Sequence, residues 1–229
     1  SSTPHGMIAV DGQDCVFLAM IMASSEKEQD LSVRTRTLEE TPEQQLLCDQ
    51  FVHGVEKEDG SLERLEFHNE DKFNFAFDIV DGLARREPDK LAMVHVANDM
   101  TERRFTFKDM KDASSQAANY FTSLGVKRGD RVMLVLKRHY QFWFAILGLH
   151  KLGAIAIPAT NQLMEHDFSY RFKAAGVSAI VCTADGDTAH QVDIAEADAG
   201  VHLTKVLVGG KREGWHDFDA EYGLFSRRY

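Results

Sequence analysis

The stretch "RVMLVLKRHYQFWFAILGLHKLG", residues 131–153, decides the fold of this chain. It begins with a short apolar strand, residues 131–137, and passes without a glycine into a nearly all-apolar helix, residues 140–152. A buried strand that leads directly into a helix is typical of a βαβ unit, in which helices cover a parallel sheet. Such sheets often hold nucleotides, yet no phosphate-binding pattern of the form GxGxxG or GxxxxGK[ST] occurs in the chain.

The same alternation of strand and helix continues downstream of this unit. Further strands are predicted over residues 154–160, 178–184 and 204–210, with helices over residues 165–175 and 188–199 between them. Continuous apolar strands that alternate with helices are buried on both sides. The sequence therefore predicts an α/β fold, in which βαβ units form a parallel sheet with helices on both faces.

Upstream of the parallel sheet, the sequence predicts a helix, a hairpin and a second helix. Apolar residues at helical spacing place the first helix within residues 73–88. Two short strands, residues 91–97 and 103–107, flank a charged turn and predict a hairpin. The second helix is predicted over residues 108–124 and is followed by a glycine, which commonly ends helices.

Residues 1–72 are predicted to form an N-terminal arm, separate from the α/β body of residues 73–229. Most of this arm, residues 24–72, is polar and rich in charge, so it either packs on the body or stays disordered. One short helix is predicted to begin at Thr41, because Pro42 suits the first position of a helix. The beginning of the arm is interpreted in part as a tag or upstream sequence.

The composition excludes several classes of protein. A formal net charge of −10 argues against a nucleic-acid surface, which is normally basic, but is compatible with binding of a small anion. The cysteines Cys15, Cys48 and Cys182 are far apart and odd in number, so neither a disulfide framework nor a zinc site is indicated. No two histidines have the spacing HxxxH, and no GxSxG pattern occurs, so neither a metal centre nor a hydrolase nucleophile is expected.

The longest apolar run, residues 15–23, is only about half a membrane span. The residues ahead of it include Asp11 and Asp14 and no Lys or Arg, which is the wrong charge for a secretion signal. We therefore predict no membrane span and a cytoplasmic location.

Ligands of open α/β sheets bind outside the carboxyl ends of the strands, so the segments that follow each strand are the candidate site. Lys137, Arg138 and His139 follow the first strand at a helix N-terminus, where they either hold a phosphate or carboxylate or are solvated residues that join strand to helix. Residues 158–161 follow the second strand and either allow a close approach to a ligand or form a turn and helix cap. Asp187, after the third strand, is interpreted as a helix N-cap.

Several motifs occur in the order known from one family of enzymes. They are "FNFAFDIVD", "RRFTFKDM", "LGVKRGDRVMLVLKR", "FWFAILGLHKLGAIAIPAT", "DFSYRFKAAGVSAIVCTAD" and "GWHDFD". Together they span residues 73 to about 222, and this segment resembles the N-terminal part of AMP-forming acyl-CoA synthetases of the acetyl or medium-chain type. The resemblance implies the fold of the N-terminal subdomain of the adenylate-forming enzymes.

The resemblance also implies a reaction for the parent enzyme. Such enzymes activate a small carboxylic acid with ATP and Mg²⁺ to an acyl-adenylate, release pyrophosphate, and then transfer the acyl group to CoA. The family's phosphate loop, TSGTTGxPK, does not occur in these 229 residues, so the chain alone is expected to be an inactive, incomplete subdomain that binds neither ATP, CoA nor Mg²⁺ tightly. The exposed face of such a subdomain is expected to self-associate. The alternative is a stand-alone, non-enzymatic α/β module that binds CoA, a nucleotide or a partner chain.

The resemblance suggests two site residues and no catalytic or metal-binding residue. Lys151 matches a position where many relatives have a cation that faces the phosphates of CoA, although a lysine here would also complement the helix dipole just before Gly153. Arg138 matches an arginine of the medium-chain relatives and is placed on the CoA or phosphate side. Trp143 and Phe144 are expected to belong to the helix core instead of an acyl pocket.

Overall fold

A computed structural model describes residues 47–229. The apolar run of residues 15–23 and most of the helix predicted from Thr41 lie outside the described residues. Where the described part begins, η2 (Leu47–Gln50) is a single 3₁₀ turn. No helix among the described residues is long and apolar enough to span a membrane.

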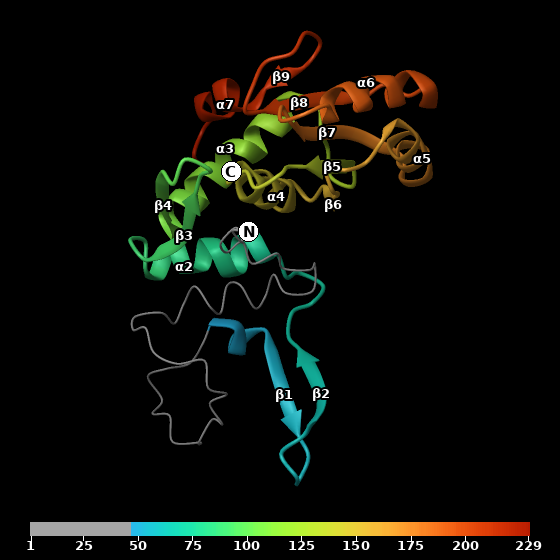
Figure 1. Cartoon of the computed structure of the whole chain (residues 1–229). Coiled ribbons are helices and arrows are strands. Elements are labelled where there is room, and N and C mark those ends of the chain that lie inside the picture. Colours follow the sequence, from blue (N-terminus) through green and yellow to red (C-terminus); the bar gives the residue numbers. More distant parts are fainter. Residues whose placement is uncertain (1–46) are drawn as a thin grey trace, which may run out of the picture.

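A five-stranded parallel sheet forms the centre of the body, which confirms the predicted α/β fold (Figure 1). In spatial order its strands are β6 (Ile155–Pro158), β5 (Arg131–Val135), β7 (Val177–Thr183), β8 (Thr204–Val208) and β9 (His216–Asp217). The helices that connect them are α4 (Gln141–Leu152), α5 (Glu165–Ala175) and α6 (Thr188–Ala199). β5, the first of these strands along the chain, therefore lies between β6 and β7, the second and third along the chain.

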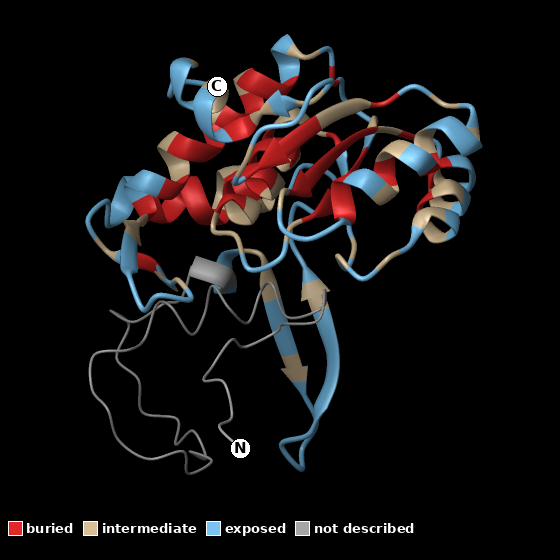
Figure 2. Cartoon of the chain, turned by 45° about the horizontal axis from the view of Figure 1, so that its top comes forward, coloured by how far each residue is buried: buried red, intermediate tan, exposed pale blue. Residues whose placement is uncertain are grey.

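Helices cover both faces of this sheet. Figure 2 shows the buried residues, in red, on the strands and on the sides of the helices that face them. Val132 and Leu134 of β5 point to one face, where they join a core with α4 and α3 (Phe107–Ser123). Met133 and Val135 point to the other face, into a core with α5 and α6. Successive side chains of a strand point to opposite faces, so a strand covered on both sides must be apolar throughout.

Local signals in the sequence fix where the helices begin and end. α3 begins with a capping box, in which the Asp109 N–H donates to Thr106 Oγ1 (3.2 Å) and the Thr106 N–H donates to Asp109 Oδ2 (2.9 Å). α4 ends at Gly153 with a φ of 78°, a left-handed conformation that glycine adopts without strain. α5 and α6 end in the same way, at Gly176 and Gly200.

The remaining predicted elements upstream of the sheet are also present. A π-helical turn, η3 (Ala76–Val80), continues into α2 (Asp81–Arg86), and both lie within the first predicted helix. The predicted hairpin is β3 (Leu91–Val96) paired with β4 (Glu102–Thr106).

Several short elements were not predicted. A hairpin of β1 (Val52–Glu56) and β2 (Leu62–Phe67) lies within the arm, where no strand was predicted. A bulge between Val55 and Glu56 interrupts the alternation of side chains, which hides the strand pattern in the sequence. The short strand β9 and the one-turn helix α7 (Phe218–Glu221) were not predicted as elements.

We expect Gly148→Ala to lower the free energy of unfolding by about 1–3 kcal/mol, although alanine has the higher helix propensity. A Cβ atom at residue 148 would lie 2.9 Å from the Cβ atom of Ala117 and 3.0 Å from the backbone nitrogen of Ala118. The helices α3 and α4 must therefore move apart where they cross in order to admit the methyl group. Urea denaturation measures the change, and a gain in stability would contradict this close packing.

Candidate functional site

The strand order places a crevice at the carboxyl ends of β5 and β7. The chain leaves β5 to form β6 on one side and then returns to form β7 on the other, so the connections diverge at this point. In doubly wound sheets, ligands bind at such a switch point, outside the carboxyl ends of the strands.

A pocket of about 290 Å³ occupies this position. Its lining comes from the segments that follow β5, β6 and β7, which are the three segments that the sequence marked as candidates. The lining residues are Lys137, Asn161, Gln162, Leu163, Met164, Asp185, Gly186, Asp187, Thr188 and Gln191. We call this pocket the strand-end crevice.

Gln191 joins two of the segments that line the strand-end crevice. Its Nε2 donates to Asp187 Oδ2 (2.7 Å), and its Oε1 accepts from the Glu165 N–H (3.1 Å). Asp187 does occupy the N-cap position of α6, as predicted, but its side chain accepts no capping hydrogen bond. The carboxylate is held by Gln191 instead, which fixes it at the edge of the crevice.

Behind the crevice, His139 bonds to the end of β7. Its Nε2 lies 2.7 Å from Oγ1 of Thr183, which is fully buried and also accepts from the Asp185 N–H (3.0 Å). Burial lowers the pKa of His139 below its usual value, although the nearby carboxylates of Asp185 and Asp219 oppose the shift. The imidazole is therefore neutral at pH 7, and its Nε2 can accept a hydrogen bond from the Thr183 hydroxyl.

The charges and hydrogen-bonding groups of the strand-end crevice favour a polar, uncharged ligand group. Lys137 is the only cation in its lining, against the carboxylates of Asp185 and Asp187. The amides of Asn161 and Gln162 add donors and acceptors. Hydroxyl and amine groups, such as those of a ribose and an adenine, match this set better than a bare triphosphate does.

Of the two residues assigned by resemblance, Arg138 lies next to the strand-end crevice without lining it. Its side chain is exposed, and its φ of 51° is left-handed, which is uncommon outside glycine. Its carbonyl oxygen lies 3.1 Å from Nε2 of His95, which ties the loop after β5 to β3. The role of the Arg138 side chain on the CoA or phosphate side stays a prediction.

Lys151 lies in the interior, away from the strand-end crevice. Its Nζ is 2.9 Å from Asp81 Oδ1 and donates to Ser115 Oγ (3.0 Å), and none of its side chain is exposed. Burial lowers the pKa of Lys151 and raises that of Asp81, while the ion pair opposes both shifts. Lys151 is also about 15 Å along α4 from the end that faces the crevice. We therefore assign it a structural role here, and its contact with CoA phosphates stays an untested prediction.

The aromatic residues of α4 lie where the sequence predicted. Phe144 is 2% exposed and belongs to the core shared with α3. Trp143 is half-buried and packs against the same core. Neither lines either of the two described pockets.

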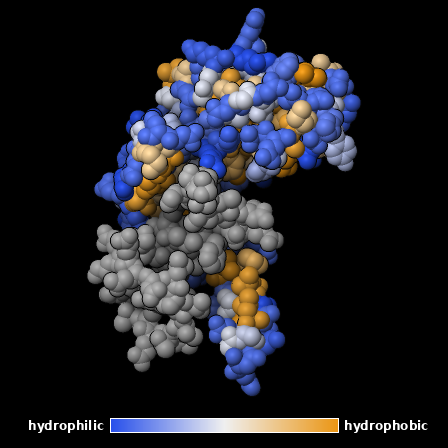
Figure 3. Space-filling view, viewed as in Figure 1, coloured by the Kyte–Doolittle hydropathy of each residue, from blue (hydrophilic) through white to orange (hydrophobic). Residues whose placement is uncertain are grey.

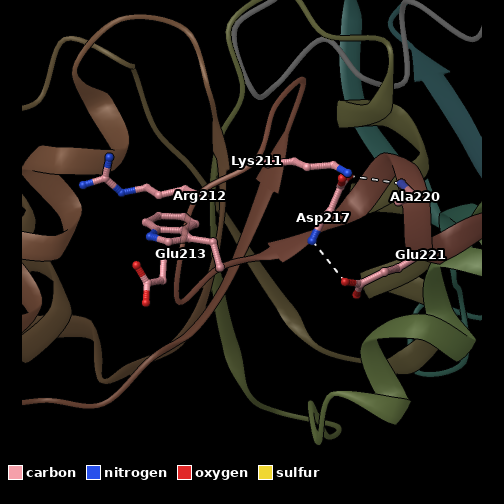
Figure 4. Close-up of a pocket in the computed structure, with 7 residues that line it drawn as sticks. Lys211, Arg212, Glu213, Asp217, Ala220 and Glu221 are labelled. Atoms are coloured by element: carbon pink, nitrogen blue, oxygen red, sulfur yellow. Dashed lines mark hydrogen bonds between the residues drawn. The ribbon is translucent and has the colours of Figure 1, made fainter.

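A second hollow of about 500 Å³ lies between the loop after β8 and α7 (Figure 4). Some of its polar atoms are bonded within the fold, whereas Lys211 and Glu213 line it without such a bond. Arg212 Nε and Trp215 Nε1 donate to Asp193 at 2.7 and 3.0 Å, and Asp217 Oδ1 accepts from the Ala220 N–H (3.1 Å). We place the ligand site at the strand-end crevice instead, because that crevice lies at the switch point of the sheet.

The carboxylate of Asp193 makes stability sensitive to acid. Burial alone would raise its pKa, but hydrogen bonds from Lys205, Arg212 and Trp215 hold the pKa below its usual value. The stabilisation is therefore complete above about pH 4 and is lost as pH falls through the folded-state pKa. We expect Asp193→Asn to lower the free energy of unfolding by about 1–3 kcal/mol at pH 7 and by less at pH 3. Urea denaturation at both pH values measures this, and a difference independent of pH would contradict it.

Sequence reasoning missed several residues of this region, among them the polar residues Gln162, Thr183 and Gln191. Gln162 directly follows a marked segment, and Gln191 lies one helical turn after Asp187 on α6, so both could have been found by extending those segments. Thr183 gave no signal, because only the structure shows its hydroxyl beneath His139.

Comparison with known proteins identifies the family. The family model described as "AMP-binding enzyme" matches residues 80–221, so the chain belongs to the AMP-binding enzyme family. The match begins within η3 and ends with α7, and so covers the whole body around the strand-end crevice.

Named relatives are acyl-coenzyme A synthetases. The chain is 34% identical over 157 residues to the mitochondrial acyl-coenzyme A synthetase ACSM2 of Rattus norvegicus, covering 65% of this chain and 27% of that protein. It is 37% identical over 153 residues to mitochondrial ACSM5 of Mus musculus, covering 64% and 26%. The chain thus spans about a quarter of the length of these relatives.

Solved structures with a similar fold are acyl-CoA ligases. The anthranilate CoA ligase AuaEII in complex with anthranoyl-AMP matches with a TM-score of 0.57 at 22% identity, covering 69% of this chain and 29% of that one. The acyl-CoA synthetase of Brucella canis matches with a TM-score of 0.56 at 23% identity, covering 69% and 28%. At these identities the likeness shows the fold, which is that of the adenylate-forming enzymes.

Proposed function

We propose that this chain is part of an AMP-forming acid–CoA ligase. The reaction would convert a small carboxylic acid, ATP and CoA into an acyl-CoA, AMP and pyrophosphate through an acyl-adenylate. Membership of the AMP-binding family and the relatives among acyl-coenzyme A synthetases support this proposal. A cytoplasmic location and self-association of the body stay predictions.

Within that reaction, the strand-end crevice would hold the nucleoside part of a substrate. ATP and CoA both carry an adenosine, and the amides of Asn161 and Gln162 together with the carboxylate of Asp185 can bond to its hydroxyl and amine groups. The single cation, Lys137, lies where one phosphate could follow. The observation that carries the assignment is the crevice at the switch point of the sheet.

The described residues fit a nucleoside better than they fit the charged groups of the reaction. One lysine against two carboxylates does not balance a triphosphate. Among residues 47–229, no group of three or more His, Cys, Asp or Glu side chains is arranged to hold a metal ion. Stabilisation of charge at the α-phosphate would fall to other residues.

We expect the 229-residue chain alone to bind AMP at millimolar concentration and to catalyse no ATP–pyrophosphate exchange. A crevice with one cation gives weak binding of a nucleotide and little help at the reacting phosphorus. Exchange is measured with acetate, butyrate and benzoate as acids, and AMP binding by titration. Exchange above the blank would contradict the proposal that residues outside this chain stabilise charge at the α-phosphate. Absence of saturable AMP binding would contradict the assignment of the crevice.

A further inference from the structure

The hairpin of β1 and β2 is an element outside the family body. It precedes the matched residues 80–221 and takes no part in the parallel sheet. Its base is anchored by the Phe51 ring, which packs on the main core and lies 5.1 Å from the Phe73 ring. The His68 N–H donates to the Phe51 carbonyl (2.8 Å), which closes the base of the hairpin itself. Beyond this base it extends away from the body (Figure 1).

One face of the hairpin is apolar. Val52 lies opposite Phe67, and Gly54 lies opposite Leu65, so these side chains share a face of the ladder. Leu62 leans onto the same face, since its Cδ1 lies 3.4 Å from where a Cβ atom of residue 54 would be. We call this surface, formed by Val52, Leu62, Leu65 and Phe67, the apolar hairpin face.

The other face of the hairpin is mostly polar, with Val55 opposite Arg64 as its apolar residue. His53 lies opposite Glu66 in the next rung of the ladder, and Arg64 Nη2 is paired with Glu66 Oε1 at 2.7 Å. The hairpin is therefore amphipathic, like a strand pair that covers another surface.

Large side chains of the apolar hairpin face are open to solvent. Leu62, Leu65 and Phe67 are 57, 49 and 56% exposed, and Figure 3 shows hydrophobic atoms gathered along the hairpin. An isolated two-stranded hairpin is marginally stable in water unless its apolar face packs against something. A contiguous exposed apolar face marks an interaction site.

The charges around the apolar hairpin face select the kind of partner. Its turn and strands carry five carboxylates and only two basic side chains, and one of the two, Arg64, already lies within 4 Å of Glu63 and Glu66. The acidic residues are Glu56, Glu58, Asp59, Glu63 and Glu66. Two copies packed face to face would bring these carboxylates together, and an anionic lipid surface would repel them.

We propose that the apolar hairpin face docks onto another protein, at an apolar patch bordered by Lys and Arg side chains. The apolar contact supplies affinity, and the acidic border supplies orientation and a faster encounter. This interaction lies outside the ligase reaction and does not depend on the strand-end crevice.

A photo-crosslinking amino acid in place of Phe67 tests which surface covers the hairpin. The full 229-residue chain carrying p-benzoylphenylalanine at this position is irradiated in an extract of the source cells, and the adduct is identified by mass spectrometry. We expect one dominant adduct with a different protein that has a basic surface. Adducts only within the same polypeptide, only with a second copy, or with no protein would each overturn the proposal.

Matched variants then test the face with that purified protein. We expect Leu65→Glu, on the apolar hairpin face, to weaken binding by about tenfold or more, while His53→Glu, which adds the same group on the polar face, leaves it unchanged. Glu58→Lys at the turn leaves the apolar face intact and should also weaken binding, as should raising NaCl from about 0.1 to 0.5 M. Equal losses with Leu65→Glu and His53→Glu, or binding insensitive to both Glu58→Lys and salt, would overturn the proposal.

Discussion

Lys151→Met is expected to lower the free energy of unfolding by about 3–5 kcal/mol at neutral pH. The Lys151 ammonium is enclosed and lies 2.9 Å from Asp81 Oδ1, whose side chain is 6% exposed. Removing the lysine leaves the Asp81 carboxylate buried without its countercharge, which costs far more than an exposed ion pair contributes. The loss should become smaller as pH falls, because Asp81 can then be buried in its protonated, neutral form.

Two further variants separate the burial of charge from the loss of a side chain. The double variant Asp81→Leu, Lys151→Met removes both charges and should recover most of the lost stability. Lys108→Met breaks the exposed pair with Asp112 on α3 and should change the free energy of unfolding by less than about 1 kcal/mol. Urea denaturation monitored by circular dichroism measures all three. A loss for Lys151→Met no larger than for Lys108→Met would contradict the structural role of Lys151.

Filling the strand-end crevice should weaken its binding of nucleotide. Gln162 lines the crevice and is exposed, so Gln162→Trp can place an indole in a volume of about 290 Å³ without disturbing the core. We expect the dissociation constant for AMP to rise about tenfold or more, since a nucleoside and the indole compete for the same space. Equilibrium titration of the wild-type chain and the variant measures the ratio.

The matched control for this variant is Lys173→Trp, at an exposed position near the far end of α5. It adds the same side chain outside the crevice and should leave AMP binding within about twofold of wild type. Both variants should unfold at the same urea concentration as the wild-type chain. Equal affinity for AMP in the Gln162→Trp variant and the wild-type chain would contradict the proposal that AMP binds in the strand-end crevice.

The alternation of strands and helices from β5 to β8, residues 131–208, was the best-predicted part of the fold. The continuous apolar residues of β5 and α4 predict a buried strand followed by a buried helix. Glycines such as Gly153 mark where the helices end. The position of the candidate site also followed, since the segments after three parallel strands must meet at one edge of the sheet. The order of the elements and the position of the candidate site both depend on patterns between residues that are close in the sequence.

Long-range pairing was not predictable in the same way. Lys151 matched a position of cations in relatives, but its partner Asp81 lies seventy residues earlier and only the packed helices bring the two together. The hairpin of β1 and β2 was hidden by its bulge and by the charged residues of its polar face. The bond between His139 and Thr183 likewise joins the segment after β5 to the end of β7, and the sequence does not state that these strands are neighbours.

The most direct test of the central claim is a two-dimensional NMR titration of the isotope-labelled 229-residue chain with AMP, with pantetheine as the control ligand. The account predicts saturable shifts of the backbone amides that follow β5, β6 and β7, including those of Lys137, Gln162 and Gly186, and no shifts with pantetheine. Shifts centred on the hollow between Lys211 and Glu221, or none that saturate, would contradict the assignment of the strand-end crevice as the nucleotide site.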